Sequence, residues 1–438
     1  MCRYNVDATD AQILLGYSDL FPGTAPELIP EIQKLNMHKA ISIISELITL
    51  RHGKMKPINV WGYSTIQLPY EAFLKKIILC LGDASCKDLS TNPIFRKNQH
   101  VISIQMLLIL LKKIIAYGNY ETLNQVDYKI TDADYAKIIQ LQLIVVDEVC
   151  QNEEHSFDRG HFIFSTYHLN HHLPDSGRFL RMYYMLEILN KDADNFPEDI
   201  RGEYRNYYDD FSTKYGITTT QYTSILFLEL QPYYLEEKTI THMSAWRTVA
   251  DTYKKAENRE IFSKALGLLS AKPEELRDWA IESQDRQWDF SKFLEAPFLQ
   301  DNEGRYISIS DYTLSNAFFE KLFWLIRDCY PENDSRAMAF YGRLFERYVQ
   351  EIAHNMKNPD YTFINEFSID SRNSKSKSSD AYLQKTNRLL VIEAKGFSNL
   401  SSVMAKNSAV DKNNSVSNFR SRCVLYKGTP KWKVCRCD

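Results

Sequence analysis

Glycine and long apolar runs are both scarce in this chain. Only 15 of the 438 residues are glycine, which favours helices over a loop-rich β architecture. The most apolar run, residues 101–115, contains Lys112 and Lys113 and is too short to span a bilayer. The first residues are polar and lack the apolar core of a secretory signal. We therefore expect a protein with no membrane segment.

A cysteine pattern typical of a disulfide framework and two glycine-rich enzyme signatures are missing as well. The eight cysteines are scattered, a distribution typical of free thiols, so we expect a cytoplasmic protein. No Gly-x-x-x-x-Gly-Lys-Ser/Thr sequence occurs, so any nucleotide-driven motor would be a separate protein. No Gly-x-Ser-x-Gly element occurs either, which argues against a nucleophilic serine of that type.

Two groups of residues have the side chains that bind zinc but not the spacing. The first group consists of His161, His168, His171 and His172. No matching cysteine pair accompanies them, so a polar turn or a packed interior loop is favoured over a zinc site. Cys435 and Cys437 have only Cys423 nearby as a further ligand. We interpret them as part of a tail.

The charges are distributed unevenly along the chain. The whole chain has a formal net charge of −3, yet residues 336–438 contain 18 Lys and Arg against 9 Asp and Glu. The remainder, residues 1–335, is correspondingly acidic. A basic C-terminal region suggests contact with a polyanion, and uneven surface charge without a partner is the alternative.

Apolar residues spaced three and four apart predict a mostly helical region over residues 1–290. The run 102–117 is apolar nearly all round, so it should be a central helix ending at Gly118. A capping sequence at Thr131 should begin a helix that runs towards Val146. Further helices are expected over 37–50, 70–81, 178–189, 244–256 and 259–269, and from Pro273.

Residues 291–335 should form a hairpin and a helix that lead into the C-terminal domain. The hairpin runs from Phe298 and turns at residues 302–304, and the helix is capped by Asp311 or Thr313 and extends to about Cys329. After the linker 331–335, an amphipathic helix is expected from Arg336.

Residues 361–369 alternate well enough for a strand, and the Ser/Lys-rich run 370–379 predicts a mobile basic loop. A β-hairpin follows, with one strand from Asp380, a polar turn at Thr386-Asn387 and a second strand to Lys395. A two-residue turn places Asp380 directly opposite Glu393, and Lys395 on the same face as Glu393. Like charges in that position destabilise a sheet, so a hard divalent cation between the carboxylates would account for them.

The second strand contains the apolar run 389–392, which predicts a buried central strand. Charges in such a strand rarely stay unpaired, which favours a functional site over a solvated hairpin with a surface salt bridge. On the helix, Glu346 borders the apolar face marked by Leu344 and Val349, so an ordinary exposed residue is an equal alternative for it.

This order of elements resembles the PD-(D/E)xK, or restriction-endonuclease-like, phosphodiesterase superfamily. Ser379-Asp380 takes the place of Pro-Asp, and Ile392-Glu393-Ala394-Lys395 that of the (D/E)xK half-motif, while the helix with Glu346 is similar to the first core helix. The resemblance implies an α+β protein whose C-terminal domain, residues 336–438, has an αβββαβ core. The stretch 399–422 is Ser/Asn-rich and only weakly helical, so the last strand would be 423–427 or the domain would be truncated.

The resemblance also implies an activity and the residues for it. Asp380, Glu393 and the Ala394 carbonyl would bind Mg²⁺ or Mn²⁺, and a water made more acidic by the cation would attack a phosphodiester. Lys395 would orient that water and offset charge in the transition state, and Glu346 would support the site. Phosphate contacts are expected from four basic residues: Arg343, Arg372, Lys375 and Lys377.

These features together predict a metal-dependent endonuclease acting on nucleic acid, more plausibly DNA than RNA. The architecture is similar to that of bacterial restriction and anti-phage defence effectors. Residues 1–290 would then recognise a target, a trigger, a partner subunit or a second copy of the chain. Two alternatives stay open: a nuclease for RNA such as tRNA, and a non-catalytic nucleic-acid-binding or scaffold protein with a degenerate site.

Overall fold

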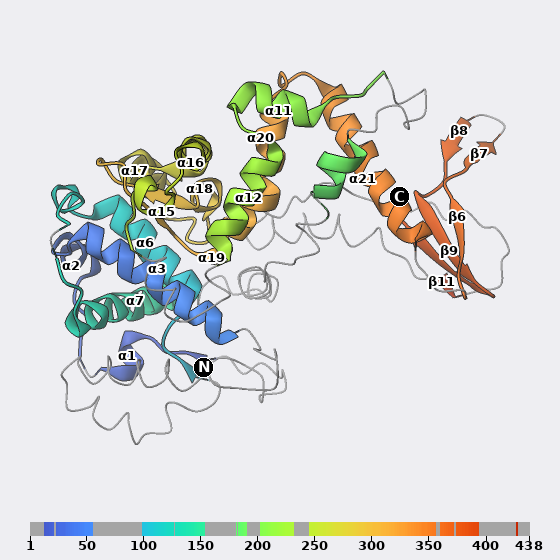
Figure 1. The fold of residues 1–438 in the computed structure, drawn as a ribbon. Coiled ribbons are helices and arrows are strands. Elements are labelled where there is room, and N and C mark those ends of the chain that lie inside the picture. The colour runs from blue at the N-terminus through green and yellow to red at the C-terminus, as the bar shows by residue number, and fades with distance from the viewer. Residues whose placement is uncertain are drawn as a thin grey trace. The chain divides into compact units, whose positions relative to one another are not determined.

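The computed structural model combines many helices with short strands, so the protein has a mixed α+β fold (Figure 1). It describes residues 13–21, 23–55, 99–126, 128–153, 181, 183–190, 202–231, 245–355, 360–371, 374–393 and 426–427. The chain divides into two units: unit 1 comprises residues 1–173 and 223–318, and unit 2 comprises 174–222 and 319–438. These units differ from the predicted division at 290 and 335, because residues 174–222 belong with the C-terminal part of the chain.

Unit 1 is mainly helical. Its helices are α1 (Tyr17–Leu20), α2 (Leu28–Gln33), α3 (Met37–Met55), α6 (Ile104–Tyr117), η3 (Tyr120–Thr122), α7 (Asp132–Glu153), α15 (Val249–Thr252), α16 (Ala256–Leu269), α17 (Pro273–Glu282), α18 (Ser291–Glu295) and α19 (Asp311–Asn316). Its strands are β1 (Ile13–Leu14), β2 (Gln99–His100), β3 (Ser270–Ala271), β4 (Phe298–Gln300) and β5 (Tyr306–Ser308). Two boundaries between the units fall within helices, namely α12 (Thr219–Leu230) and η6 (Ala317–Lys321).

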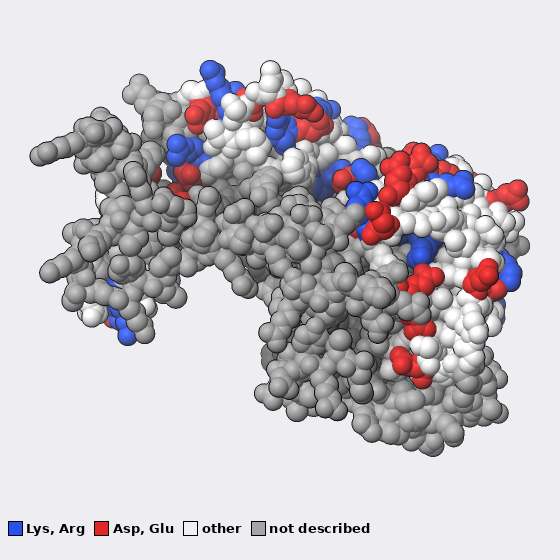
Figure 2. All heavy atoms as spheres, turned by 180° about the vertical axis from the view of Figure 1, so that it is seen from behind, with Lys and Arg blue, Asp and Glu red and all other residues white. Residues whose placement is uncertain are grey.

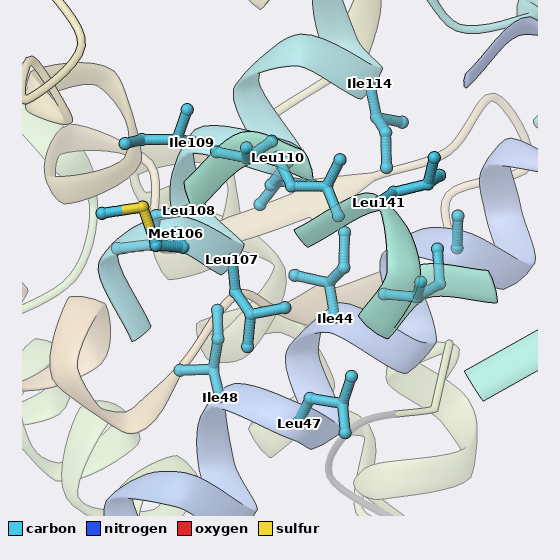
Figure 3. Packing of buried hydrophobic residues seen from close by; sticks show 14 of the residues in the cluster. Ile44, Leu47, Ile48, Met106, Leu107, Leu108, Ile109, Leu110, Ile114 and Leu141 are labelled. Carbon is cyan, nitrogen blue, oxygen red and sulfur yellow. The ribbon is translucent and has the colours of Figure 1, made fainter. Parts of the chain in front are cut away.

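The helix α6 lies at the centre of the unit 1 core, as its apolar sequence predicts. All of its residues except Lys113 and Tyr117 are buried, and α2, α3, α7 and α17 pack around it. Figure 3 shows Leu107 and Leu110 of α6 among Ile44, Ile48 and Leu141 of the neighbouring helices. The helix begins after Ser103, whose side chain accepts a hydrogen bond from the Met106 amide, and it ends at Gly118. Burial on every side explains why this helix has no polar stripe.

A lysine is buried within this apolar helix. The Lys112 ammonium donates hydrogen bonds to the carbonyl oxygens of Ser283, Arg286 and Asp289, at 2.7, 3.0 and 3.2 Å. It also lies 5.1 Å from the centre of the Trp279 ring. Three backbone acceptors match the three donors of an ammonium group, so Lys112 ties the loop after α17 to the core.

Replacing Lys112 by methionine should therefore destabilise the protein. The apolar length is kept, but three buried carbonyls lose their donor, which should lower the free energy of unfolding by about 2–4 kcal/mol. Urea titration followed by circular dichroism measures this loss. The matched control is Lys113→Met, because Lys113 forms a surface ion pair with Glu148 and should change stability by less than about 1 kcal/mol. Equal effects of the two substitutions would contradict the assigned role of Lys112.

The predicted hairpin of residues 298–309 is confirmed. Strands β4 and β5 pair antiparallel, with Leu299 opposite Ile307, and β3 pairs with β4 in parallel. Gly304 has a φ of +78°, the left-handed conformation that glycine adopts without a steric penalty. The following helix α19 is capped by Ser310, whose hydroxyl accepts from the Thr313 amide, so the predicted caps Asp311 and Thr313 were wrong by one and three residues.

Several other predicted helices can be compared with the structure. The helices predicted over 37–50, 102–117, from Thr131, over 259–269 and from Pro273 are present as α3, α6, α7, α16 and α17. The helix predicted over 244–256 was wrong in extent, because only Val249–Thr252 is helical there. The region 70–81 lies outside the described residues. Among the described helices, none has the length and apolar character needed to cross a membrane.

Unit 2 contains a helical part and a β part. Its helices are η4 (Tyr184–Leu189), α11 (Tyr207–Tyr215), α20 (Leu322–Asp328) and α21 (Ser335–His354). Its strands are β6 (Thr362–Asn365), β7 (Ser368–Ser371), β8 (Ser374–Lys377), β9 (Ala381–Lys385), β10 (Arg388–Ile392) and β11 (Tyr426–Lys427). Four strands form one sheet in the order β11-β10-β9-β6, and all its pairings are antiparallel.

The amphipathic helix predicted from Arg336 is confirmed as α21. Its N-cap is Asp334, whose carboxylate accepts hydrogen bonds from the amides of Arg336 and Ala337 at 3.0 and 3.3 Å. The buried residues Phe340 and Leu344 form its apolar face. Its first turns pack against α11, and its later turns pack against β6 and β9. This helix therefore links the helical part of unit 2 to its sheet.

Candidate metal centre

The hairpin of β9 and β10 has the predicted register. Lys385 pairs with Arg388 across the two-residue turn, and Ala381 pairs with Ile392 at the far end of the ladder. Asp380 and Glu393 each lie one residue beyond that last pair, so they occupy the next opposed position. The turn residue Thr386 has a φ of +48°, which is unusual for a β-branched residue. A tight turn of this kind fixes which residues face each other.

The two carboxylates belong to the face of the sheet opposite α21. Ala381 and Leu383 are buried, and they lie on the strand and face that α21 covers. By alternation along the strands, Asp380 and Glu393 belong to the other face, together with Tyr382 and Val391. Asp380 is only 9% exposed, whereas Glu393 is exposed. Asp380 is thus buried, whereas Glu393 lies at the protein surface.

The prediction of a buried strand at residues 389–392 was wrong. Leu390 and Val391 are 44% and 41% exposed, and the main contacts of α21 with the sheet are to β9 and β6. The apolar sequence of β10 therefore reflects strand propensity more than burial. The argument for a functional site has to rest on register and on the contacts of α21 instead.

The helix α21 contacts the site through a residue that sequence reasoning missed. The Gln350 side-chain amide donates a hydrogen bond of 3.0 Å to the carbonyl oxygen of Asp380. Glu346 lies one helical turn before Gln350, on the same face of the helix. This bond fixes the backbone at the start of β9 against α21, so it positions the Asp380 carboxylate. A polar residue four positions after Glu346 was the sequence signal that could have identified it.

Glu346 and Arg343 form an ion pair with each other. The Arg343 Nη1 atom lies 3.0 Å from the Glu346 Oε2 atom, and both side chains are about one-third exposed or less. Burial lowers the pKa of Arg343, but the hydrogen bond from Glu346 and the nearby charges of Glu203 and Glu366 outweigh it and raise that pKa above its ordinary value. The predicted metal-supporting acid and phosphate-binding base are therefore direct partners, beside the turn that carries Gln350.

The donor types at this site fit a hard divalent cation. Asp380 and Glu393 offer carboxylate oxygens, which are the ligands that Mg²⁺ and Mn²⁺ prefer. Among the described residues, no three His, Cys, Asp or Glu side chains cluster closely enough to hold a metal ion alone. The remaining ligands would therefore be water and the backbone. The predicted ligand Ala394 and the predicted catalytic Lys395 lie outside the described residues.

The prediction of a mobile loop over residues 370–379 was wrong for most of its length. Residues 368–371 and 374–377 form the antiparallel strands β7 and β8, with Asp370 opposite Lys375. Lys377 is also on β8, whereas Arg372 lies outside the described residues. The strand predicted over 361–369 is accordingly interrupted at residues 366–367.

The base of the β7–β8 ribbon is fixed close to Asp380. The amide of Phe367 donates to the Ser378 hydroxyl, and the Ser378 amide donates to the Phe367 carbonyl, both at 2.9 Å. The Ser379 amide donates a hydrogen bond of 2.9 Å to the Tyr382 hydroxyl. Ser378 precedes Asp380 by two residues, so the basic ribbon begins where the candidate metal ligand lies (Figure 1).

The surface drawn in Figure 2 carries charges of both signs. Lys and Arg side chains lie next to Asp and Glu side chains over the described residues of that view. Some charged residues form ion pairs with close neighbours in the sequence, for example Lys264 with Glu260 and Lys292 with Glu295.

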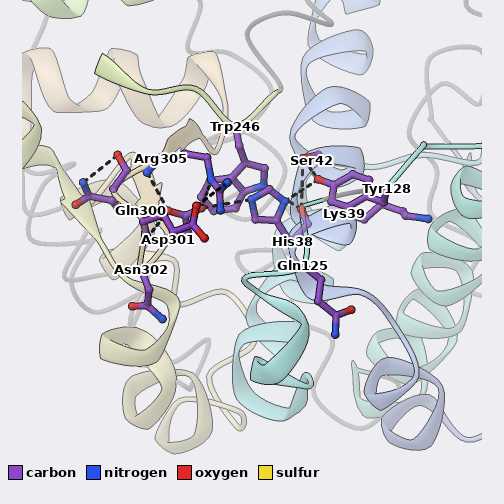
Figure 4. A network of polar contacts seen from close by, with 12 residues as sticks. His38, Lys39, Ser42, Gln125, Tyr128, Trp246, Gln300, Asp301, Asn302 and Arg305 are labelled. Atoms are coloured by element: carbon purple, nitrogen blue, oxygen red, sulfur yellow. Dashed lines mark hydrogen bonds and ion pairs between the residues drawn. The ribbon is translucent and has the colours of Figure 1, made fainter. Parts of the chain in front are cut away.

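Unit 1 contains a buried polar network that sequence reasoning also missed (Figure 4). The His38 Nδ1 atom is 2.7 Å from the Tyr128 hydroxyl, and its Nε2 atom is 3.5 Å from a carboxylate oxygen of Asp301. The ring stacks on Trp246 at 4.3 Å between centroids. The Asp301 carboxylate accepts a 2.6 Å hydrogen bond from Arg305. Both His38 and Asp301 are almost fully buried, so this network holds elements together and does not meet a substrate.

This network makes stability depend on pH. Burial lowers the pKa of His38 to about 4, and Arg305 adds to that effect while Asp301 opposes it. The folded protein therefore keeps the imidazole neutral, whereas the unfolded chain binds a proton near pH 6.5. Acidification from about pH 6.5 to about pH 4 should consequently favour unfolding, by roughly 2–3 kcal/mol from this residue. Urea titrations across that range measure the slope, and His38→Gln should flatten it. An unchanged slope in that variant would exclude His38 as the cause.

The two weaker metal-binding groups from the sequence, including His161 and Cys435, lie outside the described residues. Comparison of the chain with models of protein families, with curated proteins and with solved structures finds no match. The functional argument therefore depends on the residues themselves.

Proposed function

We propose that this protein is a Mg²⁺- or Mn²⁺-dependent nuclease that hydrolyses phosphodiester bonds of DNA. The observation that supports the proposal is the register of β9 and β10, which ends with Ala381 opposite Ile392, so that Asp380 and Glu393 are the next residue on each strand. Two opposed carboxylates repel each other in a sheet. A divalent cation bound between them would attract both and so offset that repulsion. The contact of Gln350 with the Asp380 backbone supports the proposal, because it gives one ligand a fixed position.

Each residue of the proposed site has a separate task. Asp380 and Glu393 would hold the cation, and the predicted further ligand is the Ala394 carbonyl. When bound, the cation would supply Lewis-acid chemistry for phosphodiester hydrolysis. Lys395 would orient the attacking water and offset negative charge in the transition state. Glu346 forms an ion pair with Arg343 on α21, which packs on the other face of the sheet, so we do not assign Glu346 to the cation.

The basic ribbon supplies contacts to the nucleic acid backbone. Lys375 and Lys377 lie on β8, whose base is joined to the residues just before Asp380. Phosphate contacts of this kind orient a substrate without reading its sequence. Arg372 would add to them. Arg343 is less suited to that task than predicted, because its guanidinium already pairs with Glu346.

The test is cleavage of supercoiled plasmid by the full chain, in Mg²⁺ or Mn²⁺ and in EDTA. We expect nicked and linear products only when the cation is present. Binding of DNA without cleavage under all conditions would instead favour a non-catalytic nucleic-acid-binding protein. Cleavage of tRNA but not of plasmid would assign the site to RNA. Within anti-phage defence, residues 1–290 would recognise the trigger, a partner subunit or a second copy of the chain.

A further inference from the structure

An exposed aromatic ring lies next to the proposed catalytic carboxylates. Phe367 stacks on Tyr382, with 5.6 Å between the ring centroids and 30° between the ring planes. Phe367 nevertheless remains 40% exposed. Tyr382 is on the strand face that also carries Asp380 and Glu393, two residues from Asp380. An aromatic surface is therefore available on the face where the proposed chemistry occurs.

Hydrogen bonds fix the backbone of Phe367 and the ring of Tyr382, on which the Phe367 ring stacks. The backbone of Phe367 is bonded in both directions to Ser378, and the hydroxyl of Tyr382 accepts from the Ser379 amide. The Ser378 hydroxyl also donates to the Ser379 carbonyl, at 3.2 Å. A ring whose position is fixed in this way loses little conformational freedom when a second planar group stacks on it.

The chemistry of this surface matches an unpaired nucleotide. A base presents a flat π face, and stacking on an aromatic side chain is strong and tolerant of sequence. In a duplex both faces of each base are already stacked on neighbouring base pairs, so the ring gains nothing from duplex DNA. Lys375 and Lys377 belong to the neighbouring strand β8 and add formal positive charge to this part of the chain, which favours a polyanion. The combination of a fixed ring with a basic ribbon is typical of surfaces that bind single strands.

We propose that Phe367, supported by Tyr382, stacks on a base of single-stranded DNA and so strengthens the binding of unpaired strands relative to duplex DNA. This inference rests on the proposed nuclease function for its biological meaning. The binding surface itself does not require cleavage.

The experiment measures binding of the full chain to a fluorescent single-stranded DNA and to the matching duplex, by anisotropy at fixed salt. Ca²⁺ replaces Mg²⁺ so that both DNAs stay intact. We expect Phe367→Ala to weaken single-strand binding about 5- to 150-fold and duplex binding by less than about 2-fold. Phe367→Trp should bind the single strand at least as tightly as the original protein, because the larger ring stacks better.

Tyr361 provides a matched control. It is 39% exposed, belongs to the same unit and lies by Lys385, at the turn end of the sheet and away from Asp380. Tyr361→Ala should change single-strand binding by less than about 2-fold, since its ring is outside the proposed path of the strand. Equal losses on single-stranded and duplex DNA for Phe367→Ala, or no loss on either, would overturn the proposal. A folded Phe367→Trp variant that fails to bind the single strand would overturn it as well.

The result can be separated from the outcome for the nuclease. If Glu393→Gln still cleaves DNA while Phe367→Ala loses single-strand binding, the stacking surface stands and the proposed catalytic site falls. If Glu393→Gln abolishes cleavage while Phe367→Ala binds normally, the nuclease stands and the stacking surface falls.

Discussion

Cleavage of DNA should fall at least about 10²–10³-fold when Glu393 is replaced by glutamine. The substitution keeps the size and polarity of the side chain but removes the charge that attracts the cation. Asp380→Asn should have an effect of the same order, because the two residues occupy opposite positions of one hairpin. Initial rates of plasmid nicking in Mg²⁺ and in Mn²⁺ measure the loss.

Metal binding gives a second measurement that is independent of activity. A cation that binds only the folded protein raises its melting temperature with increasing concentration. The original protein should show that rise with Mn²⁺, and Glu393→Gln and Asp380→Asn should not. Lys395→Ala should keep the rise but lose cleavage, because the lysine acts on the water and the phosphate and does not bind the cation.

One further variant is a control for this site, and another tests how Asp380 is positioned. Asp360 pairs with Lys385 at the turn end of the sheet, so Asp360→Asn should leave both the cleavage rate and the metal effect unchanged. Gln350→Leu removes the hydrogen bond to the Asp380 carbonyl and should lower cleavage by about 10- to 100-fold, as expected for a residue that positions a ligand. Full cleavage by both Glu393→Gln and Asp380→Asn would leave the proposed site without support.

The sequence was most informative where a local rule determines the geometry. The turn at Thr386-Asn387 fixes the pairing of β9 with β10, so the opposition of Asp380 and Glu393 followed from two residues. The central position of α6 followed in the same way, because a helix with no polar side can only be buried.

The sequence was least informative where tertiary packing decides the outcome. The apolar run in β10 did not show how much of that strand the rest of the fold covers, so Leu390, which is 44% exposed, was expected to be buried. The Ser/Lys-rich composition of residues 370–379 gave no sign that Asp370 and Lys375 would pair across a ribbon. The contacts of Gln350 and His38 join residues 30 or more positions apart, and a single sequence does not show which distant residue is the partner of either side chain.

A buried ion pair in unit 1 should dominate the stability of that unit. The Arg247 Nη2 atom lies 2.8 Å from the Glu229 Oε2 atom, and both side chains are almost fully buried. The Tyr253 hydroxyl donates to the other Glu229 oxygen at 3.2 Å, and the Arg247 guanidinium lies 4.9 Å from the centre of the Tyr306 ring. Backbone hydrogen bonds of 2.9 and 2.8 Å join Arg247 to Tyr306 in both directions. The pair therefore connects α12 with β5.

Removing one partner leaves the other charge buried, which is the most destabilising kind of single substitution. We expect Arg247→Met and Glu229→Leu each to lower the free energy of unfolding by about 3–5 kcal/mol. The double variant should lose much less than the sum of the two, because no charge is then left without a partner. Urea unfolding of the four proteins gives the coupling energy. Additive losses would mean that the two side chains stabilise the fold independently, through packing and through their other contacts. Strong coupling would mean that unit 1 depends on the pair as one element, since the backbone bridge to Tyr306 remains in every variant.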